Sequence, residues 1–298
     1  EEQQMLIDVV KRFATNDLRP AARDADEAKD FPPTLVEKGW EIGLLQGSIP
    51  EEYGGFGKRS VVTSVLALEE MAWGDTPGSM AVMAPALFAI PLLLAGSEEQ
   101  KKTYLPPVIE SKWKPYTAAL IEPFFDFDPN DLRTIAVEED DAYVINGEKI
   151  NVPFAADAEA MIVYAKFRGR TQGFIVSGKA EGLHVGERHK LLGAHALPNY
   201  SVRFDHLRVP KDNLLGGLRG HDFSEVLASM RVATAAMAVG LSRAAYEYGR
   251  DYAKEREAFG VKIAQKQAIA FMLAEMITEI EAVRLLVWEA AWMIDNAK

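Results

Sequence analysis

The sequence predicts an α+β fold with an N-terminal α-helical domain, a small antiparallel β-barrel in the middle, and a C-terminal helical bundle that is incomplete as given. Two patterns predict this order. Apolar residues recur at helical spacing at both ends of the chain, and short apolar runs separated by turn residues lie between them. With 298 residues the chain is too long for one small domain. We place the domains at residues 1–114, 115–216 and 217–298.

The first domain is predicted to be helical. Apolar residues recur at helical spacing from Met5 to Phe13, and Ser97 with Gln100 three residues later forms a capping box at the start of a helix. The most apolar stretch, Met80–Ala95, is shorter than the about 20 residues that span a membrane. We therefore interpret it as a buried core helix and expect no membrane span.

The middle domain has the pattern of short strands. Asn146-Gly147 between the segments Tyr143–Ile145 and Glu148–Ile150 is a strong hairpin signal, because both residues tolerate positive φ. Several strands at short spacing favour a small antiparallel barrel or sandwich. Three further strands are predicted at Met161–Ala165, Gly173–Val176 and Tyr200–Phe204.

The last domain is predicted to contain two long amphipathic helices joined by a turn near Gly260. One apolar stripe runs from Phe223 to Leu241, and the other runs from Ile269 to Val287. Two such helices form only half of a four-helix bundle. We expect the missing half to come from residues outside this sequence or from another subunit.

Composition excludes several classes of function. The chain has 33 basic and 44 acidic residues and a formal net charge of −11, which disfavours a nucleic-acid partner. It has no cysteine, so disulfides and thiolate catalysis are excluded, and we expect a cytoplasmic protein. The histidines lack the spacing of metal ligands, so we expect no metal site. They are His184, His189, His195, His206 and His221.

Several motifs in the same order along the chain carry a resemblance to a known family. The most specific is Tyr252–Gly260, a helix ending in Arg-x-x-Phe-Gly, followed by Gln267. The others are the loop Ile49–Gly57, the tripeptide Ile121-Glu122-Pro123, the run Asn146–Lys149 and the segment Val209–Gly216. Together with the domain order, they make the chain resemble the acyl-CoA dehydrogenase family over essentially its whole length.

The resemblance implies a flavoprotein oxidoreductase of fatty acid metabolism with FAD as its cofactor. Family members desaturate an acyl-CoA thioester at the α,β carbons and pass the electrons to an electron-transfer flavoprotein. It also implies an oligomer: a homodimer, a homotetramer or a heteromer. The implied cofactor-binding residues are Leu120, Ile121, Asn151, Val152, Pro153, Arg256, Ala258, Phe259 and Gln267, and the implied substrate-binding residues are Phe127 and Arg231.

The side-chain chemistry at the Arg256 corner agrees with this role. A guanidinium offers a rigid fork of donors that suits a pyrophosphate, and the ring of Phe259 offers a face for adenine. In the family this corner binds the FAD of a neighbouring subunit.

The sequence departs from the family at the flavin loops. A Gly-Ala-Gly-Ser-Asp-like run is replaced by Phe124–Asp128, whose rings fill space that glycines would leave open. Ile121 lacks the hydroxyl expected at its position. The family's Trp-Ile-Thr is Asn151-Val152-Pro153, and Pro153 has neither a hydroxyl nor a backbone N–H.

The catalytic residue is unknown from this sequence. In some members a carboxylate precedes the arginine that matches Arg231, and that position is Met230. In most members the carboxylate lies beyond the position of Lys298. Two other hypotheses therefore stay open beside the dehydrogenase: a non-catalytic partner subunit of a heteromeric dehydrogenase, and a relative of the flavin monooxygenases.

Overall fold

The computed structural model describes residues 2–296, which divide into two compact units. The helical unit comprises residues 2–23, 60–79 and 228–296, and the sheet unit comprises residues 24–59 and 80–227. Each unit is assembled from segments that are distant in the sequence. The three domain boundaries expected above stay a prediction.

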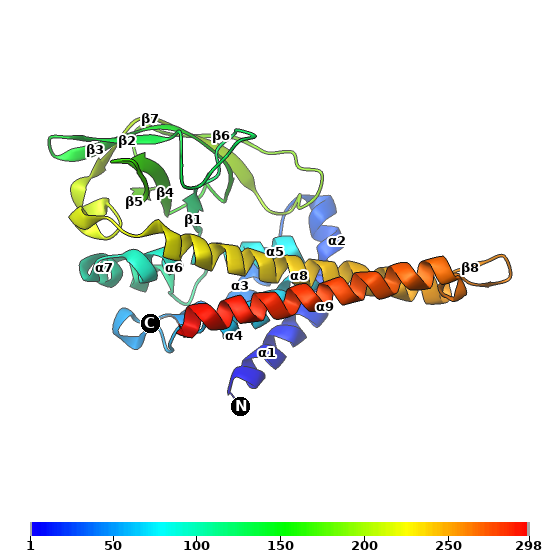
Figure 1. Ribbon diagram of the computed structural model, residues 1–298. Coiled ribbons are helices and arrows are strands. Elements are labelled where there is room, and N and C mark those ends of the chain that lie inside the picture. Colours follow the sequence, from blue (N-terminus) through cyan, green and yellow to red (C-terminus); the bar gives the residue numbers. More distant parts are fainter. Residues whose placement is uncertain (1, 297–298) are drawn as a thin grey trace. The chain divides into compact units, whose positions relative to one another are not determined.

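The helical unit is built mainly from four helices. Figure 1 shows α8 and α9 as two long helices joined by a short hairpin, which confirms the predicted helix pair of the bundle. The unit's helices are α1 (Glu2–Phe13), α4 (Val61–Gly74), α8 (Phe223–Glu255) and α9 (Gln267–Asn296), and a π-helical turn at Ala14–Leu18 connects α1 to α2 (Arg19–Ala28).

A buried carboxylate of α4 links this helix to α8 and α9. Glu69 is 4% exposed and accepts hydrogen bonds from Arg243 of α8 at 2.8 Å and from Arg284 of α9 at 2.9 Å. Glu70 accepts two further bonds from Arg243. Trp73 donates its ring N–H to Glu247 at 2.7 Å. A buried charge is tolerated when it is paired and hydrogen-bonded in this way.

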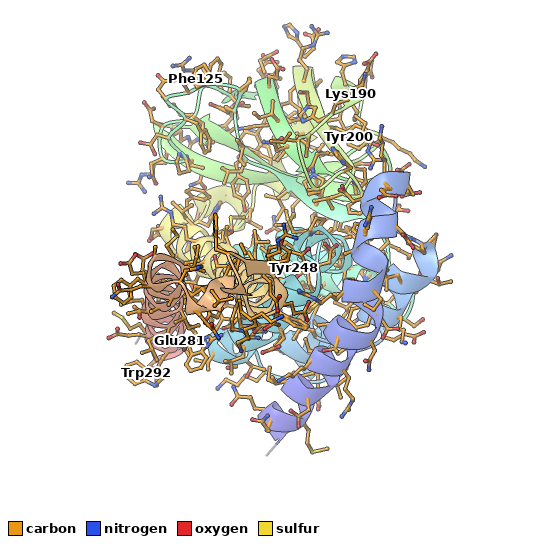
Figure 2. All side chains as sticks on the ribbon, turned by 90° about the vertical axis from the view of Figure 1, so that its right-hand side faces the viewer. Phe125, Lys190, Tyr200, Tyr248, Glu281 and Trp292 are labelled. Carbon is orange, nitrogen blue, oxygen red and sulfur yellow. The ribbon has the colours of Figure 1, made fainter. Side chains whose placement is uncertain are left out.

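Much of the apolar surface of α9 has no cover within the helical unit. Figure 2 shows Trp292 projecting from this helix, and it is 59% exposed. Leu285, Leu286 and Met293 are exposed to a similar degree. Several large apolar side chains exposed on one helix are typical of an interaction site.

The sheet unit contains a seven-stranded mixed sheet, drawn in green in Figure 1. The strand order is β1-β4-β2-β3-β7-β6, and β5 pairs with the other edge of β4. The strands are β1 (Tyr116–Ala119), β2 (Ile135–Glu139), β3 (Ala142–Pro153), β4 (Ala160–Phe167), β5 (Arg170–Ser177), β6 (Leu183–Arg188) and β7 (Asn199–Pro210).

The middle sheet forms a half-barrel, and it differs from the predicted small antiparallel barrel in two respects. β4 pairs in parallel with β1 and with β2, so the sheet is mixed. No pairing among the described residues joins β6 back to the far side of the sheet, and closure requires such a pairing. The sheet is curved around an apolar core in which the rings of Tyr143, Phe167 and Phe174 meet edge to face. The strands predicted within β4, β5 and β7 are confirmed.

The predicted hairpin turn at Asn146-Gly147 is also wrong. Both residues lie inside β3, which runs on to Pro153 with a register shift between Ile145 and Gly147. Gly147 has φ of 152°, and a Cβ there would lie 2.5 Å from the hydroxyl of Thr134. The glycine therefore permits a close approach of another segment within a strand, which is the other common reason for glycine at such a position.

Short helices complete the sheet unit, and α6 packs against β1. The predicted capping box of Ser97 and Gln100 is present at the start of α7. The single helix predicted at Met80–Ala95 is instead the end of α5 followed by α6, because the chain turns at Pro85. The bounds are α3 (Pro33–Trp40), α5 (Thr76–Val82), α6 (Ala86–Ala95) and α7 (Glu98–Val108).

By length and composition, α8 could cross a membrane, and so could α5 and α6 taken together. The core helices of water-soluble proteins pass the same test, so this finding assigns no membrane span.

Candidate functional site

The Arg-x-x-Phe-Gly string forms the tip of the helical unit. α8 ends at Glu255, and the strands β8 (Glu257–Ala258) and β9 (Val261–Lys262) pair as a hairpin before α9 begins at Gln267. The two turn residues are Phe259 and Gly260, with φ of 54° and 79°. Positive φ at both turn positions matches the twist of the paired strands.

Phe259 is an unusual residue for this turn. A bulky side chain rarely adopts positive φ, and such strain is found mostly at functional positions. Its ring is 96% exposed, with the ammonium of Lys266 at 5.5 Å from the ring centroid. Arg256 is exposed beside the hairpin, and its guanidinium has no ion pair among residues 2–296. The hairpin therefore presents an aromatic face and unpaired cationic donors to solvent.

The segment Asn151–Pro153 lies in the sheet unit at the end of β3. A second register shift between β3 and β7 falls between Lys149 and Val152, and it places Asn151 in a bulge with φ of 54°. Asn151 is exposed, whereas Val152 is buried at 1%. Of the three predicted cofactor residues here, only Asn151 has a side chain that a ligand can reach; Val152 and Pro153 are buried.

Two residues missed by the sequence analysis hold Asn151 in place. His189 Nδ1 lies 3.3 Å from the side-chain oxygen of Asn151, and His189 Nε2 lies 2.8 Å from the hydroxyl of Ser201. His189 follows β6 and Ser201 belongs to β7, so only the sheet pairing brings them to Asn151. No sequence pattern links these positions.

Leu120, Ile121 and Glu122 connect β1 to the unusual Phe124–Asp128 run. Glu122 is buried and accepts hydrogen bonds from the main-chain N–H groups of Arg133 and Thr134, both at 2.8 Å. The fully buried Lys149 ammonium donates to Glu122 at 2.9 Å and to the Leu120 carbonyl at 3.0 Å. The pair therefore closes the base of the loop.

The Phe124–Asp128 run is folded onto its own loop. Arg133 lies 4.0 Å from the ring centroid of Phe124 and binds Asp126 at 2.6 Å. The side chain of Phe125 is fully exposed at one edge of the sheet unit, as Figure 2 shows, and Phe127 is half-buried. Within the sheet unit, at least one of the three rings thus points away from the core.

Burial would raise the pKa of Glu122, but the hydrogen bonds from Arg133, Thr134 and Lys149 outweigh it and hold that pKa below its usual value. Burial also lowers the pKa of Lys149 to about 8, although Glu122 opposes this shift.

These pKa shifts predict how stability depends on pH. Both folded pKa values lie below the unfolded ones, so the unfolded state binds more protons in each window. The free energy of unfolding should therefore fall as pH drops below about 4.5, where an unfolded glutamate takes up its proton. It should also rise between pH 8 and 10.5, where only the unfolded state keeps Lys149 charged. Urea unfolding at several pH values measures the free energy of unfolding of the wild type and of the variant Glu122→Gln/Lys149→Met. The difference between the two proteins isolates the contributions of Glu122 and Lys149. If the free energy changed with pH equally in both proteins, these two residues would not be the cause.

Arg231, the predicted substrate-binding arginine, lies on α8 in the helical unit, and its side chain is exposed. The preceding residue, Met230, is half-buried and supplies no carboxylate. No group of three or more potential metal ligands occurs among the described residues.

The chain matches the three domain models of one family. These are the acyl-CoA dehydrogenase N-terminal domain at residues 1–112, the middle domain at residues 117–207 and the C-terminal domain at residues 220–298. The chain is 34% identical to the caffeyl-CoA reductase–Etf complex subunit CarC of Acetobacterium woodii, over all of this chain and 80% of that protein.

Solved structures agree. The butyryl-CoA dehydrogenase of Megasphaera elsdenii matches with a TM-score of 0.87 and 30% identity, over 99% of this chain and 80% of that one. The FAD complex of PigA matches with a TM-score of 0.88 and 25% identity, over all of this chain and 80% of that one.

The fold and the comparisons define a FAD-dependent oxidoreductase. The chain belongs to the acyl-CoA dehydrogenase family. The residues present fit the cofactor at two places. The unpaired Arg256 guanidinium suits the pyrophosphate of FAD, and the exposed Phe259 ring suits its adenine. The exposed Asn151 amide suits the polar edge of a flavin ring.

Proposed function

We propose that the chain oxidises an acyl-CoA thioester at the α,β carbons, a reaction for which bound FAD would supply the hydride-accepting chemistry. The observation that carries this proposal is the strained hairpin at Phe259, which exposes an aromatic face beside the unpaired Arg256. Arg256 would bind the pyrophosphate of the FAD held by a neighbouring subunit, and Phe259 would pack against its adenine. Ala258 and Gln267, which flank this turn, would complete the adenosine end of the site.

The flavin ring of this chain's own FAD would lie against its sheet unit. Leu120 and Ile121 would border the flavin ring, together with the main chain of Val152 and Pro153 and the side chain of Asn151. For the substrate, we propose that Phe127 lies at the CoA portion and that Arg231 helps to position the substrate. The chemistry at the thioester requires hydrogen bonds that polarise the carbonyl in the transition state.

The variant Arg256→Ala should bind FAD at least about tenfold more weakly while its folded structure is retained, because a charge-assisted contact to a diphosphate is lost. Flavin fluorescence titration measures the affinity, and circular dichroism checks the fold. Arg250→Ala is the matched control, because Arg250 is a half-buried arginine of the same helix that pairs with its neighbour Asp251. Unchanged FAD affinity in Arg256→Ala would rule out this role.

We also propose an electron-transfer flavoprotein as the electron acceptor and a cytoplasmic location. CarC of Acetobacterium woodii is named as a subunit of a complex with such a flavoprotein, which supports this choice of partner. Mixing the purified chain, an acyl-CoA and an electron-transfer flavoprotein, and following reduction of the latter's flavin, tests the assignment.

We propose a homodimer or homotetramer that buries the exposed apolar surface of α9. The change Leu286→Glu should shift the protein toward monomers, because each buried carboxylate would lack a partner. Sedimentation velocity at micromolar concentration measures the effect, with Glu279→Gln on an exposed position of the same helix as the control. A wild-type monomer under these conditions would contradict the proposal.

A non-catalytic partner subunit is the second candidate, because Met230 supplies no base and the Phe124–Asp128 run replaces small residues. The two candidates differ in a direct test. The purified protein is titrated with FAD, and turnover of a panel of acyl-CoAs is followed with an artificial electron acceptor. Turnover of any acyl-CoA supports the enzyme, and FAD binding only after addition of a second dehydrogenase subunit supports the partner subunit.

A further inference from the structure

The β-bulge at the end of β3 carries a side chain held in an unusual state. Asn151 adopts φ of 54°, is exposed, and lies at a register shift between β3 and β7. Bulges recur beside active sites because they re-aim one side chain out of the regular alternation. Asparagine tolerates the left-handed region better than most residues, yet the conformation still costs free energy relative to extended backbone.

A chain of two hydrogen bonds fixes the orientation of the Asn151 side chain. The amide oxygen of Asn151 can only accept, so the His189 Nδ1 that faces it at 3.3 Å must carry the proton. His189 Nε2 in turn faces the Ser201 hydroxyl at 2.8 Å. Tyr200 and Lys190, labelled in Figure 2, adjoin Ser201 and His189 in the sequence and mark this part of the sheet unit.

The remaining group of the side chain, the NH2 of Asn151, makes no hydrogen bond among the described residues. An amide whose oxygen is anchored presents both N–H donors to a ligand in one fixed direction. Pro153 has no backbone N–H, and the side chains of Val152 and Pro153 are apolar. The Asn151 amide is therefore the side-chain donor of the segment Asn151–Pro153.

We propose that His189 is a positioning residue that locks Asn151 as a hydrogen-bond donor to an electron-rich carbonyl or ring nitrogen of the flavin. This inference rests on the proposed function, in which Asn151 borders the flavin ring. A donor at the ring stabilises the reduced flavin, which carries more negative charge than the oxidised form. His189 acts only through Asn151 and touches neither flavin nor substrate.

The test measures FAD affinity and the midpoint potential of bound flavin in the full chain. Asn151→Asp keeps an acceptor for His189 but removes the donor, so we expect a lower potential and about three- to tenfold weaker FAD binding. His189→Leu frees the amide and should show a smaller change in the same direction. His206→Asn is the control, because His206 is an exposed histidine of β7 whose ring lies 2.8 Å from the carboxylate of the neighbouring Asp205.

A double-mutant cycle separates positioning from a general structural effect. If His189 acts through Asn151, adding His189→Leu to Asn151→Ala should change neither the affinity nor the potential further. A wild-type potential in Asn151→Asp, or additive effects in the double variant, would overturn the inference. Failure of the wild-type chain to bind FAD at all would instead overturn the proposed function on which it rests.

Discussion

The substitution Gly240→Ala should destabilise the helical unit by about 3 kcal/mol or more, the upper end of what overpacking costs. At Gly240, α8 crosses α4 with almost no space between the backbones. A Cβ there would lie 2.2 Å from the main-chain oxygen of Glu69 and 2.9 Å from the main-chain nitrogen of Trp73. These atoms belong to a helix backbone and cannot move aside as a flexible side chain would.

The clash should also disturb the charged network at the same crossing. Glu69 holds Arg243 and Arg284, and a shift of α8 away from α4 would lengthen the bond to Arg243. A buried carboxylate that loses a partner is costly. The loss of stability in Gly240→Ala should therefore exceed that caused by an added methyl group elsewhere in the helical unit.

Gly249→Ala is the matched control because it lies in the same helix and its Cβ would meet nothing within 4 Å. Alanine is the better helix former, so this variant should be more stable by roughly 0.5–1 kcal/mol. Thermal and urea unfolding monitored by circular dichroism compare the two variants with the wild type. Equal stability of Gly240→Ala and the wild type would show that the two helices are not in contact at Gly240.

Local sequence signals predicted the elements that depend on local interactions. The capping box at Ser97 and the long helices around Gly260 are set by neighbours within a few residues, and both were predictable. Asn146-Gly147 has the signature of a turn, but Thr134 fills the space beside Gly147 and β3 continues. That contact depends on the pairing of β2 with β3, which the dipeptide itself does not encode.

The candidate site likewise contains residues that local sequence predicts and residues that only the folded structure brings together. Arg256 and Phe259 lie within one string, so a family resemblance could find them together. Asn151, His189 and Ser201 meet only because β3, β6 and β7 are neighbours in the sheet. Neither the lone histidine nor the serine carries a sequence signal of its own. The glycine at residue 240 is similar, since its role depends entirely on the position of α4.

The second large effect is expected at the buried pair below the Phe124–Asp128 run. Glu122→Gln should lower the stability of the sheet unit by about 3 kcal/mol, the range for breaking a buried ion pair. Lys149 would then lie fully buried with its ammonium next to a neutral amide. The glutamine oxygen can still accept from the main chain of Arg133 or Thr134, so the loss is mainly that of the charge pairing.

The double variant Glu122→Gln/Lys149→Met should recover much of the loss, because it removes the unpaired charge and fills the same volume with an apolar chain. Lys149→Met alone should be destabilised, since it leaves the Glu122 carboxylate without its cation and the Leu120 carbonyl without its donor. Urea unfolding at pH 7 gives the three free energies, and their non-additivity gives the coupling between the two side chains. Because the pair closes the loop that begins at Phe124, Glu122→Gln should also increase proteolysis between Phe124 and Arg133, and the double variant should increase it less. Independent, additive losses in the three variants would show that the Glu122–Lys149 bond does not hold this loop.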